Sequence, residues 1–456
     1  MKFKADDCSP FYKESEVITD YKEQTLLDFV ASVDNISIYG ERSALYDSES
    51  KIAYDPLDVS PWHFEDGPKR VWLAGRYIGT AKIGKSIVEI KPRFGEEWLY
   101  YLADDLFHFR KVDSKTKAND GSWNKLFRRL FWHIWLRKFA EADKYGLPRH
   151  TTDHTNQGMQ IRGRLNVHKS FLPLYRKGEV VSQYREKTLD DSICRIIYRA
   201  YGILVEEQLS DVGIPPTIKD SINALYNHYH DQIIQITEHD YQSIRYKSIY
   251  MGWKPLVDFS WQIINHKLND GKRAGKNGFS IFLDVAEIWE AFLRKQIGER
   301  LADSGWRVWS MWECKQRIYI DTFFSRDIMP DIVLERDARD GEKEYMIFDA
   351  KYKVMEGRSF DVDRADLFQI HTYIQYFTHV LGHVKVAGLL YPLAEKNDKL
   401  PTITSLFGIN GNQATTFIID GIVCKDMKTE DDKTYFENSI KELVERIITK
   451  CDSSSE

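Results

Sequence analysis

The sequence predicts an α/β protein in which a C-terminal domain, a mixed sheet flanked by helices, follows a β-rich N-terminal part and a mostly helical middle part. Two patterns support this prediction. In the last third of the chain, short apolar runs alternate with segments of helical periodicity, which is typical of an α/β layer. Between residues 70 and 93, alternating apolar runs are separated by glycines, which indicates a β-hairpin or a small barrel.

The composition is that of a globular protein: the 456 residues are 43% hydrophobic and 29% charged. This length suits two to four domains. We expect a β-rich N-terminal domain at 1–110, a mostly helical, basic region at 111–275, an α/β domain at 276–450 and a disordered tail at 451–456.

Neither a membrane span nor a secretory signal is predicted. No run of 18 apolar residues occurs, and the first residues, MKFKADDCSPFYKE, lack an apolar core. The five cysteines are scattered without a CxxC pair, which disfavours a zinc site or a disulfide framework. These observations predict a cytoplasmic protein.

Basic residues are concentrated in the middle of the chain. The formal net charge is −5, yet between residues 121 and 190 Lys and Arg outnumber Asp and Glu by 14 to 6. Such a region is an electrostatic footprint for phosphates or for an acidic partner.

The N-terminal part contains a match to a nucleotide-binding loop. Residues 79–86, GTAKIGKS, satisfy GxxxxGK[ST]. A P-loop needs a strand before it and a helix after it, so that backbone amides face phosphate. Here the alternating, β-branched segment IVEIKP follows, so we predict a turn between two strands. Upstream, a short helix is predicted at 21–33.

Three features of the middle part allow two interpretations each. The segment 123–138 has basic residues between apolar ones at helical spacing, which suits either a core helix with a solvated face or a helix that contacts phosphates. Arg162 and Arg164 flank Gly163 and form either an exposed turn or a nucleic-acid or partner contact. The basic loop at 269–278 is a hinge or a phosphate contact.

In the C-terminal part, the pattern predicts a definite order of elements. A helix comes first, four strands follow, and a helix, two strands and a final helix complete the domain. The expected ranges are, in order, 284–301, 307–313, 318–324, 331–334, 345–351, 363–380, 384–391, 415–419 and 435–448.

Two acidic residues stand at the ends of neighbouring apolar runs. Asp331 marks the end of one run, and Asp349 with Lys351 marks the end of the next. The polar segment 335–344 between the runs suits a hairpin, which would bring the three residues to one end of a sheet. Two carboxylates beside an ammonium can hold a divalent metal and stabilise a developing negative charge. The alternative is ordinary turn chemistry at strand ends.

Pro330 and Asp331, followed by Asp349 and Lys351, match the PD-(D/E)xK nuclease signature. We therefore predict a restriction-endonuclease-like domain that binds Mg²⁺, or Mn²⁺, through Asp331, Asp349 and the Ala350 carbonyl. The metal would activate a water and polarise the scissile phosphate. Lys351 would orient that water or stabilise the charge of the transition state.

Two helices add candidate site residues. Glu290, on the helix before the sheet, is predicted to bind the metal directly or through water. Gln369 and Tyr373 lie four apart on the helix after the sheet, hence on one face; Gln369 would position Lys351 or a phosphate, and Tyr373 would contact DNA or a partner. A purely structural role is the alternative for all three. Lys353 contacts a DNA phosphate or is solvated.

The chain resembles the McrC family, the nuclease subunits of McrBC modification-dependent restriction systems. The resemblance extends over residues 70–450 and rests on a series of motifs. These are IRGRLNV at 161–167, YREKTLDDSICRIIYRA at 184–200, LDVAEIWEAFL at 283–293, MPDIVL at 329–334, IFDAKYK at 347–353, DLFQIHTYIQYF at 366–377 and LLYP at 389–392.

The resemblance implies a division of labour between two proteins. The family partner is a McrB-like AAA+ GTPase hexamer that hydrolyses GTP and translocates DNA, while the McrC-like subunit stimulates the partner and cuts double-stranded, in some cases methylated, DNA. In the family, the part before the nuclease domain docks the partner. The basic region 121–190, with Arg162 and Arg164, is therefore the candidate docking or DNA-contacting surface.

Two other functions remain as alternatives. The chain is alternatively a non-catalytic adaptor that regulates an AAA+ motor and retains the nuclease fold, although the intact Asp331, Asp349 and Lys351 favour the enzyme. A third interpretation is an RNA nuclease or a recombination-type nuclease that shares the fold.

Overall fold

The structure is a computed structural model. It describes residues 1–31, 36–39, 57–64, 67–83, 86–107, 132, 134–206, 214–232, 234–269, 280–320, 324–338, 341–355, 361–396, 399–406 and 415–453. The chain divides into two compact units, one formed by Met1–Lys111 together with Ala274–Glu456 and the other by Val112–Arg273. The N-terminal and C-terminal parts, which we predicted as separate domains, thus belong to one unit.

A seven-stranded sheet with the order β3-β2-β1-β8-β7-β12-β4 forms the N-terminal part of the first unit. β12 follows the second unit in the chain, yet it pairs antiparallel with β7 and parallel with β4. This pairing joins the N-terminal and C-terminal parts, and no local pattern in the sequence indicates it. The strands are β1 (Lys2–Asp6), β2 (Tyr12–Lys13), β3 (Glu16–Val17), β4 (Ile36–Tyr39), β7 (Tyr77–Ile83), β8 (Ser86–Lys91) and β12 (Ser280–Asp284).

The match to a nucleotide-binding loop lies in a β-hairpin, as predicted. β7 and β8 pair antiparallel with Gly79 opposite Ile90, and Ser86 begins a strand rather than a helix. Gly84 and Lys85 lie outside the described residues. The remaining elements of this part are α1 (Gln24–Ala31), α2 (Glu96–Phe107) and the two-stranded ribbon of β5 (Leu57–Phe64) and β6 (Gly67–Ala74).

The C-terminal part is built on a mixed six-stranded sheet with the order β13-β16-β17-β18-β20-β19, which confirms the predicted α/β class. β17, β18 and β20 run parallel, and β16 and β19 are antiparallel to their neighbours. The strands are β13 (Arg307–Val308), β16 (Ile332–Asp337), β17 (Lys343–Ala350), β18 (His383–Leu393), β19 (Thr402–Leu406) and β20 (Thr415–Val423).

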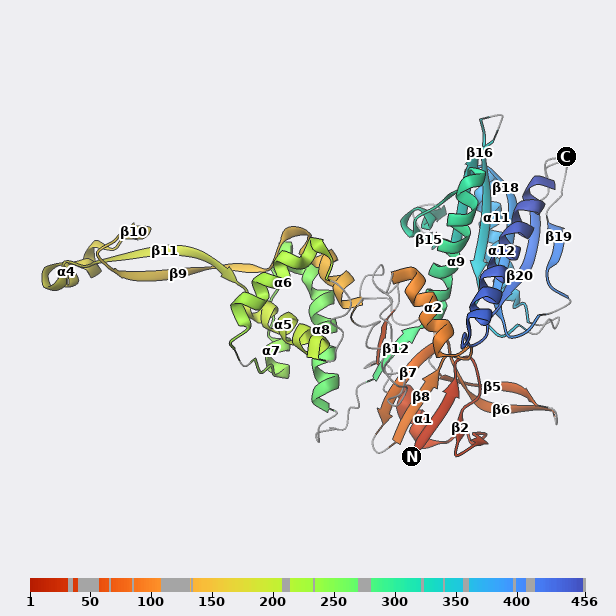
Figure 1. Cartoon of the computed structure of the whole chain (residues 1–456), viewed down its shortest axis with the longest axis horizontal. Helices are drawn as coiled ribbons and strands as arrows, with labels where there is room; N and C mark the ends of the chain where they lie inside the picture. The colour runs from red at the N-terminus through yellow and green to blue at the C-terminus, as the bar shows by residue number, and fades with distance from the viewer. Residues whose placement is uncertain are drawn as a thin grey trace. The chain divides into compact units, whose positions relative to one another are not determined.

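Helices cover both faces of this sheet (Figure 1). α11 (Arg364–Val380) packs on β17 and β18 through Ile370, Ile374 and Phe377. α9 (Val285–Leu301) and α12 (Glu430–Ser453) pack against the sheet and against each other, with the rings of Phe292 and Phe436 stacked at 5.8 Å. Because both faces are covered, β17 has five consecutive buried residues, which is the pattern of a strand in a sandwiched sheet.

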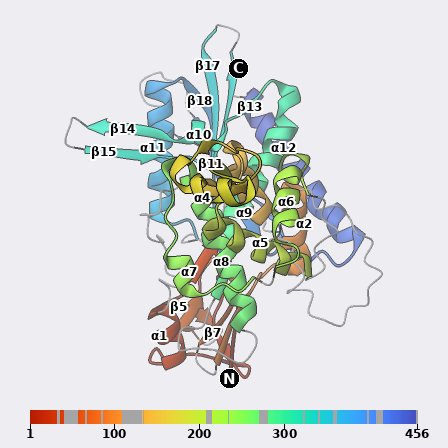
Figure 2. The ribbon, with the colours of Figure 1, turned by 90° about the vertical axis from the view of Figure 1, so that its left-hand side faces the viewer.

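Two predicted strands before β16 are wrong in detail. The segment predicted as a strand at 307–313 leaves β13 after Val308 and forms the short helix α10 (Met311–Cys314). A capping box causes this, since the Glu313 carboxylate accepts from the Ser310 N–H at 2.7 Å. The segment 318–324 is a hairpin rather than one strand (Figure 2): β14 (Gln316–Ile320) pairs with β15 (Phe324–Ile328).

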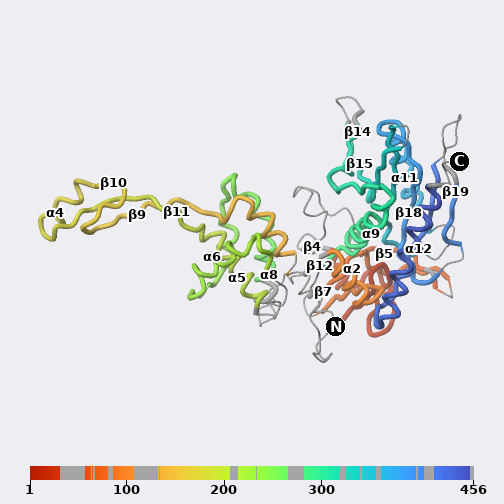
Figure 3. Tube along the Cα trace, turned by 45° about the horizontal axis from the view of Figure 1, so that its top comes forward, coloured from red at the N-terminus to blue at the C-terminus, as the bar shows by residue number. Residues whose placement is uncertain are grey.

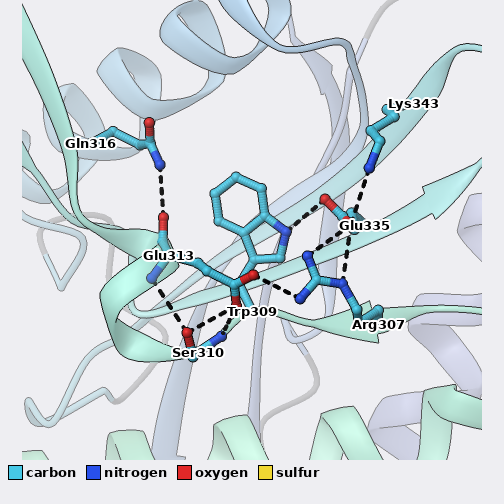
Figure 4. A network of polar contacts seen from close by, with 7 residues as sticks. All are labelled: Arg307, Trp309, Ser310, Glu313, Gln316, Glu335 and Lys343. Carbon is cyan, nitrogen blue, oxygen red and sulfur yellow. Dashed lines mark hydrogen bonds and ion pairs between the residues drawn. The ribbon is translucent and has the colours of Figure 1, made fainter.

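A network of polar contacts connects residues of β13, β16 and β17 at the β13 edge of the sheet (Figure 4). The Glu335 carboxylate accepts from Arg307 Nη2 at 2.8 Å, from Trp309 Nε1 at 2.8 Å and from Lys343 Nζ at 3.2 Å. Arg307 Nη1 also donates to Glu313 Oε1 at 2.9 Å, which connects the network to the cap of α10.

The second unit contains a helical core. Its helices are 134–142, α5 (Asp191–Glu206), α6 (Pro216–Tyr229), α7 (Glu238–Gln242) and α8 (Lys254–Asn269). Trp132 and Trp135 are buried and stack at 6.1 Å, and Trp135 Nε1 donates to Ser260 Oγ on α8 at 2.9 Å. The described part of the 123–138 segment therefore fits a core helix; residues 123–131 lie outside the described ranges.

A long β-ribbon, which we call the arm (residues 149–189), extends from these helices (Figure 1; Figure 3). β9 (Arg149–Gly158) and β11 (Val180–Leu189) pair antiparallel along their whole length. The short β10 (Arg164–Leu165) and the helix α4 (Val167–Lys177) complete the arm. We predicted this middle region as mostly helical, so the arm is a correction to that prediction.

The end of the chain also differs from the prediction. α12 continues to Ser453, and Cys451, assigned to a disordered tail, is buried at 1% exposure. An amphipathic helix predicted at 435–448 is thus longer at both ends. All five cysteines are free thiols. Among the helices that the structure describes, none is long and apolar enough to cross a membrane.

Candidate active site

The β16–β17 hairpin brings together the two carboxylates at its end, as the sequence predicts. Ile332 lies opposite Phe348, so Asp331 and Asp349 are neighbours just beyond that pair. The Ala350 N–H donates to Asp331 Oδ2 at 2.8 Å. Both aspartates are buried, which charged residues rarely are unless they have a partner.

Asp349 is almost completely buried, at 1% exposure. Burial raises its pKa well above the usual range; the Asp331 carboxylate raises this pKa further, and Lys351 lowers it. Among the residues that the structure describes, Asp349 Oδ1 has no hydrogen-bond partner. A buried carboxylate oxygen without a partner is costly, so this atom is suited to receive a cation.

Lys351 lies among three acceptors. Its ammonium forms an ion pair with Asp349 and another with Asp366 Oδ1 at 3.3 Å, and it donates to Gln369 Oε1 at 2.9 Å. Burial lowers the pKa of Lys351, but Asp349 and Asp366 raise it more, so the pKa is above its usual value. Lys351 therefore brings a positive charge into the site.

α11 presents Gln369 and Tyr373 on one face, as predicted, and both side chains make hydrogen bonds within the protein. Tyr373 is buried, which leaves little of its surface for the DNA or partner contact that the sequence predicts. Its hydroxyl accepts from Gln369 Nε2 at 2.7 Å and donates to the Met329 carbonyl at 3.2 Å. A chain of hydrogen bonds thus connects Lys351 to the backbone just before Asp331, and Tyr373 positions Gln369.

Sequence reasoning missed Asp366. It is buried at 5% exposure and accepts from Lys353 Nζ at 2.7 Å as well as from Lys351. The signal was present, since Asp366 lies one helical turn before Gln369. Lys353 also pairs with Asp363 at 3.6 Å, and its side chain is 44% exposed, so a phosphate can still reach it.

α9 connects Glu290 to the site through Arg294. Asp284 caps this helix by accepting from the Ala286 N–H at 3.0 Å. One turn apart on α9, Arg294 Nη2 donates to the buried Glu290 Oε1 at 2.8 Å. Arg294 Nε donates to the Asp331 carbonyl at 2.8 Å. Arg294, which sequence reasoning also missed, thereby holds the backbone of Asp331.

The residues of the site fit a divalent metal held by two carboxylates. Within the described ranges, no group of three or more His, Cys, Asp and Glu side chains is arranged to hold a metal, so Glu290 does not complete such a group. Mg²⁺ keeps several waters and often uses only one or two carboxylates. Asp331 and Asp349 supply that number, and the unpartnered Asp349 Oδ1 is available to the ion.

The predicted contact residues Arg162 and Arg164 lie on the arm and are exposed. Gly163 between them has a φ of 77°, and a Cβ there would meet the Gln183 carbonyl. The turn between the two arginines therefore requires glycine.

The end of the arm exposes apolar side chains around these arginines. α4 is attached to β11 mainly through Ser170, whose hydroxyl accepts from the Val181 N–H at 2.7 Å, and Ser170 is the buried residue of this helix. Apolar residues that stay exposed form what we call the tip surface: Met159, Ile161, Leu165, Val167, Phe171, Leu172, Leu174 and Tyr175. Contiguous exposed apolar residues are typical of interaction sites.

The chain is thus an α/β protein in which two carboxylates and a lysine lie together at the end of a mixed sheet that helices cover on both faces. The family model described as McrBC 5-methylcytosine restriction system component matches residues 73–392. The chain belongs to this family, which confirms the resemblance seen in the sequence motifs.

Solved structures with a similar chain come from Thermococcus gammatolerans. One contains McrB AAA+ hexamers with bound McrC; its matching chain is 13% identical, with 97% of this chain and 100% of that chain covered and a TM-score of 0.48. A second is the McrBC complex, with 11% identity, 67% of this chain and 88% of that chain covered, and a TM-score of 0.31. No curated protein matches the sequence.

Proposed function

We propose that this chain is the DNA-cleaving subunit of a McrBC-type restriction system, a PD-(D/E)xK nuclease that hydrolyses phosphodiester bonds with Mg²⁺ or Mn²⁺. The observation that carries the proposal is the convergence of Asp331, Asp349 and Lys351 at the end of one hairpin. The buried, unpartnered oxygen of Asp349 supports metal binding, and family membership supports a restriction system.

Asp331 and Asp349 would hold the metal, with the Ala350 carbonyl as a further ligand. When bound, the ion lowers the pKa of a coordinated water and stabilises charge on the phosphate. The Ala350 N–H orients the Asp331 carboxylate, and Arg294 holds the Asp331 backbone. These contacts fix the ligands before DNA arrives, which is the arrangement that favours catalysis.

Lys351 would place its ammonium beside the scissile phosphate. Asp366 and Gln369 hold it from the α11 side, and Tyr373 orients Gln369. A lysine fixed in this way stabilises the negative charge that develops on the phosphate or orients the attacking water. Lys353, which is partly exposed beside it, would contact a neighbouring phosphate.

The arm would couple the nuclease to a McrB-like AAA+ GTPase hexamer. The tip surface combines exposed apolar side chains, such as Phe171 and Tyr175, with Arg162 and Arg164. Interfaces are enriched in aromatic and arginine side chains of this kind. We assign the tip surface to the partner rather than to DNA, because apolar side chains gain nothing from the phosphate backbone.

The proposal is tested by DNA cleavage in the reconstituted system. The chain is combined with its AAA+ partner, GTP, Mg²⁺ and methylated DNA, and wild type is compared with Asp349→Asn. We expect Asp349→Asn to abolish cleavage, because the metal loses a charged ligand, and to leave the stimulation of GTP hydrolysis intact. Chelating Mg²⁺ should also abolish cleavage, but it stops GTP hydrolysis as well, because the GTPase needs the same ion.

The matched control is Asp420→Asn. Asp420 is also buried, and it pairs with Arg446 at 2.8 Å rather than with any site residue, so this variant should still cleave. Cleavage by Asp349→Asn at the wild-type rate would contradict the proposal. Stimulation of the GTPase by a wild-type chain that leaves the DNA intact would instead establish the non-catalytic adaptor.

A further inference from the structure

Two residues of the N-terminal sheet lie at the edge that faces the catalytic segment. Asp7 follows β1, and Arg93 follows the neighbouring parallel strand β8. The Arg93 N–H donates to Asp7 Oδ1 at 2.8 Å, and the Asp7 N–H donates to the Lys91 carbonyl at 2.8 Å. Main-chain hydrogen bonds thus fix both residues to the sheet.

From this edge, side chains reach the backbone directly after Lys351. The Arg93 guanidinium carbon lies 4.5 Å from the centre of the Tyr352 ring, and Arg93 Nη2 donates to the Lys353 carbonyl at 3.1 Å. The Cys8 thiol donates to the Tyr352 carbonyl at 3.7 Å. Two consecutive carbonyls of the catalytic segment are therefore held by the N-terminal part of the chain.

The Tyr352 ring is enclosed by aromatic residues of the same part. It packs edge-on against Phe94 with 6.3 Å between ring centres and lies nearly parallel to Trp98 at 6.4 Å. Trp98 in turn contacts Trp289 at 6.1 Å, the residue before Glu290 on α9. The aromatic cluster leaves little freedom to the segment that carries Lys351.

The charges of Asp7 and Arg93 are costly to bury. Asp7 is fully buried, and burial raises its pKa to about 6 even though Arg93 lowers it. Charged groups that are taken out of water in this way generally stabilise a fold no better than apolar groups of similar size. An apolar side chain at position 93, however, could not hold the Lys353 carbonyl, so stability alone does not account for this arginine.

We propose that Arg93 is a positioning residue for the catalytic lysine. By stacking on Tyr352 and holding the Lys353 carbonyl, it fixes the backbone of residues 351–353 and keeps the Lys351 ammonium among its acceptors. The N-terminal sheet is then a part of the nuclease rather than a separate module. The catalytic consequence of this inference rests on the proposed nuclease function.

The test compares Arg93→Lys with Arg336→Lys in the full chain. Arg93→Lys keeps the charge beside Asp7 but removes the planar guanidinium that stacks and donates. With the AAA+ partner, GTP, Mg²⁺ and methylated DNA, we expect kcat for cleavage to fall on the order of 10²-fold, because a small misplacement of a catalytic group has this effect. KM for DNA and stimulation of the GTPase should not change.

Arg336→Lys is the matched control. Arg336 also lies over an aromatic ring, 4.4 Å from the centre of Trp306, and it donates to Glu344 at 2.8 Å. It belongs to the end of β16 away from Asp331, so its loss should leave kcat at the wild-type value. Equal losses in the two variants would overturn the inference.

Amide hydrogen exchange gives a readout that does not depend on cleavage. The Lys351 N–H donates to the Leu390 carbonyl at 2.9 Å, and we expect Arg93→Lys to accelerate its exchange about tenfold by loosening this segment. Tyr352→Leu, which removes the ring but leaves Arg93, should do the same. Unchanged exchange in both variants would overturn the inference. Accelerated exchange in a chain that never cuts DNA would support the positioning of residues 351–353 by Arg93 and refute the nuclease function.

Discussion

Two antiparallel ribbons of this protein, β16–β17 and β9–β11, have similar hydrogen-bond ladders and opposite surroundings. β17 has five consecutive buried residues, because helices cover both faces of its sheet. β9 alternates between exposed and half-buried residues and contains no buried one. The first ribbon therefore holds its side chains in fixed positions, which a catalytic site needs, and the β9 strand of the second leaves its side chains accessible.

The ion pairs of the two ribbons differ in the same way, since one is largely buried and the other is exposed. Asp349 and Lys351 form a buried pair with 1% and 13% of their side chains exposed, so the positions of their atoms are closely defined. On the arm, Arg185 and Asp153 pair at 2.9 Å with 78% and 75% exposed. Such a surface pair contributes little to stability. The charges of this pair on the arm are thus accessible to solvent, whereas those of the hairpin are held by the groups around them.

The largest difference between the ribbons should appear when the same residue type is truncated in each. Phe348→Ala in β17 removes a fully buried ring, and we expect it to lower the free energy of unfolding by about 3–5 kcal/mol. Phe171→Ala at the end of the arm removes a ring that is 78% exposed; the expected change is within about 0.5 kcal/mol. Urea-induced unfolding measures both. A large loss for Phe171→Ala would show that the arm has a core that its exposure does not indicate.

Truncation at the end of the arm, which should hardly affect stability, should have a large effect on binding to the partner. Replacing Phe171 and Tyr175 together by alanine should weaken binding to the AAA+ partner roughly tenfold or more, because buried aromatic side chains dominate interface energies. The readout is the concentration of this chain that half-maximally stimulates GTP hydrolysis. Tyr226→Ala is the control, since Tyr226 is also exposed but lies on α6 of the helical core. Equal effects of the two changes would exclude the tip surface as the docking site.

The sequence was informative wherever local chemistry decides the structure. Asp331 stands directly before one apolar run and Asp349 at the end of the next, with a polar segment between the runs, and this spacing predicts the hairpin that the structure contains. The spacing of Gln369 and Tyr373 places both on one helical face. Ser86 followed by β-branched residues identified a hairpin where the motif alone suggested a nucleotide loop.

The sequence was uninformative where contacts between distant segments determine the structure. The pairing of β12 with β7 joins residues 280–284 to 77–81, and no local pattern encodes such a register. Arg93 and Asp7 have no motif, because their role depends on contacts with residues 352 and 353. The strands of the arm were missed for a different reason, since the polar alternation HTTDHTNQG lacks the apolar face on which strand prediction depends.

The smallest expected effect concerns the polar network at the β13 edge, where exposed charges lie against a buried sheet (Figure 4). The Ser310 N–H, Arg307 and the Ser310 hydroxyl lower the pKa of Glu313 to about 2. Because this pKa is below the ordinary glutamate value of 4.5, the carboxylate contributes its full stabilisation above pH ~4.5 and loses it as the pH falls toward ~2. Glu313 is largely solvated, so we expect Glu313→Gln to cost about 0.5–1 kcal/mol at pH 6, the magnitude of a helix cap. Urea-induced unfolding should show a smaller loss of stability from Glu313→Gln at pH 3.5 than at pH 6. An equal loss at both pH values would show that the charge of the carboxylate has no part in capping α10.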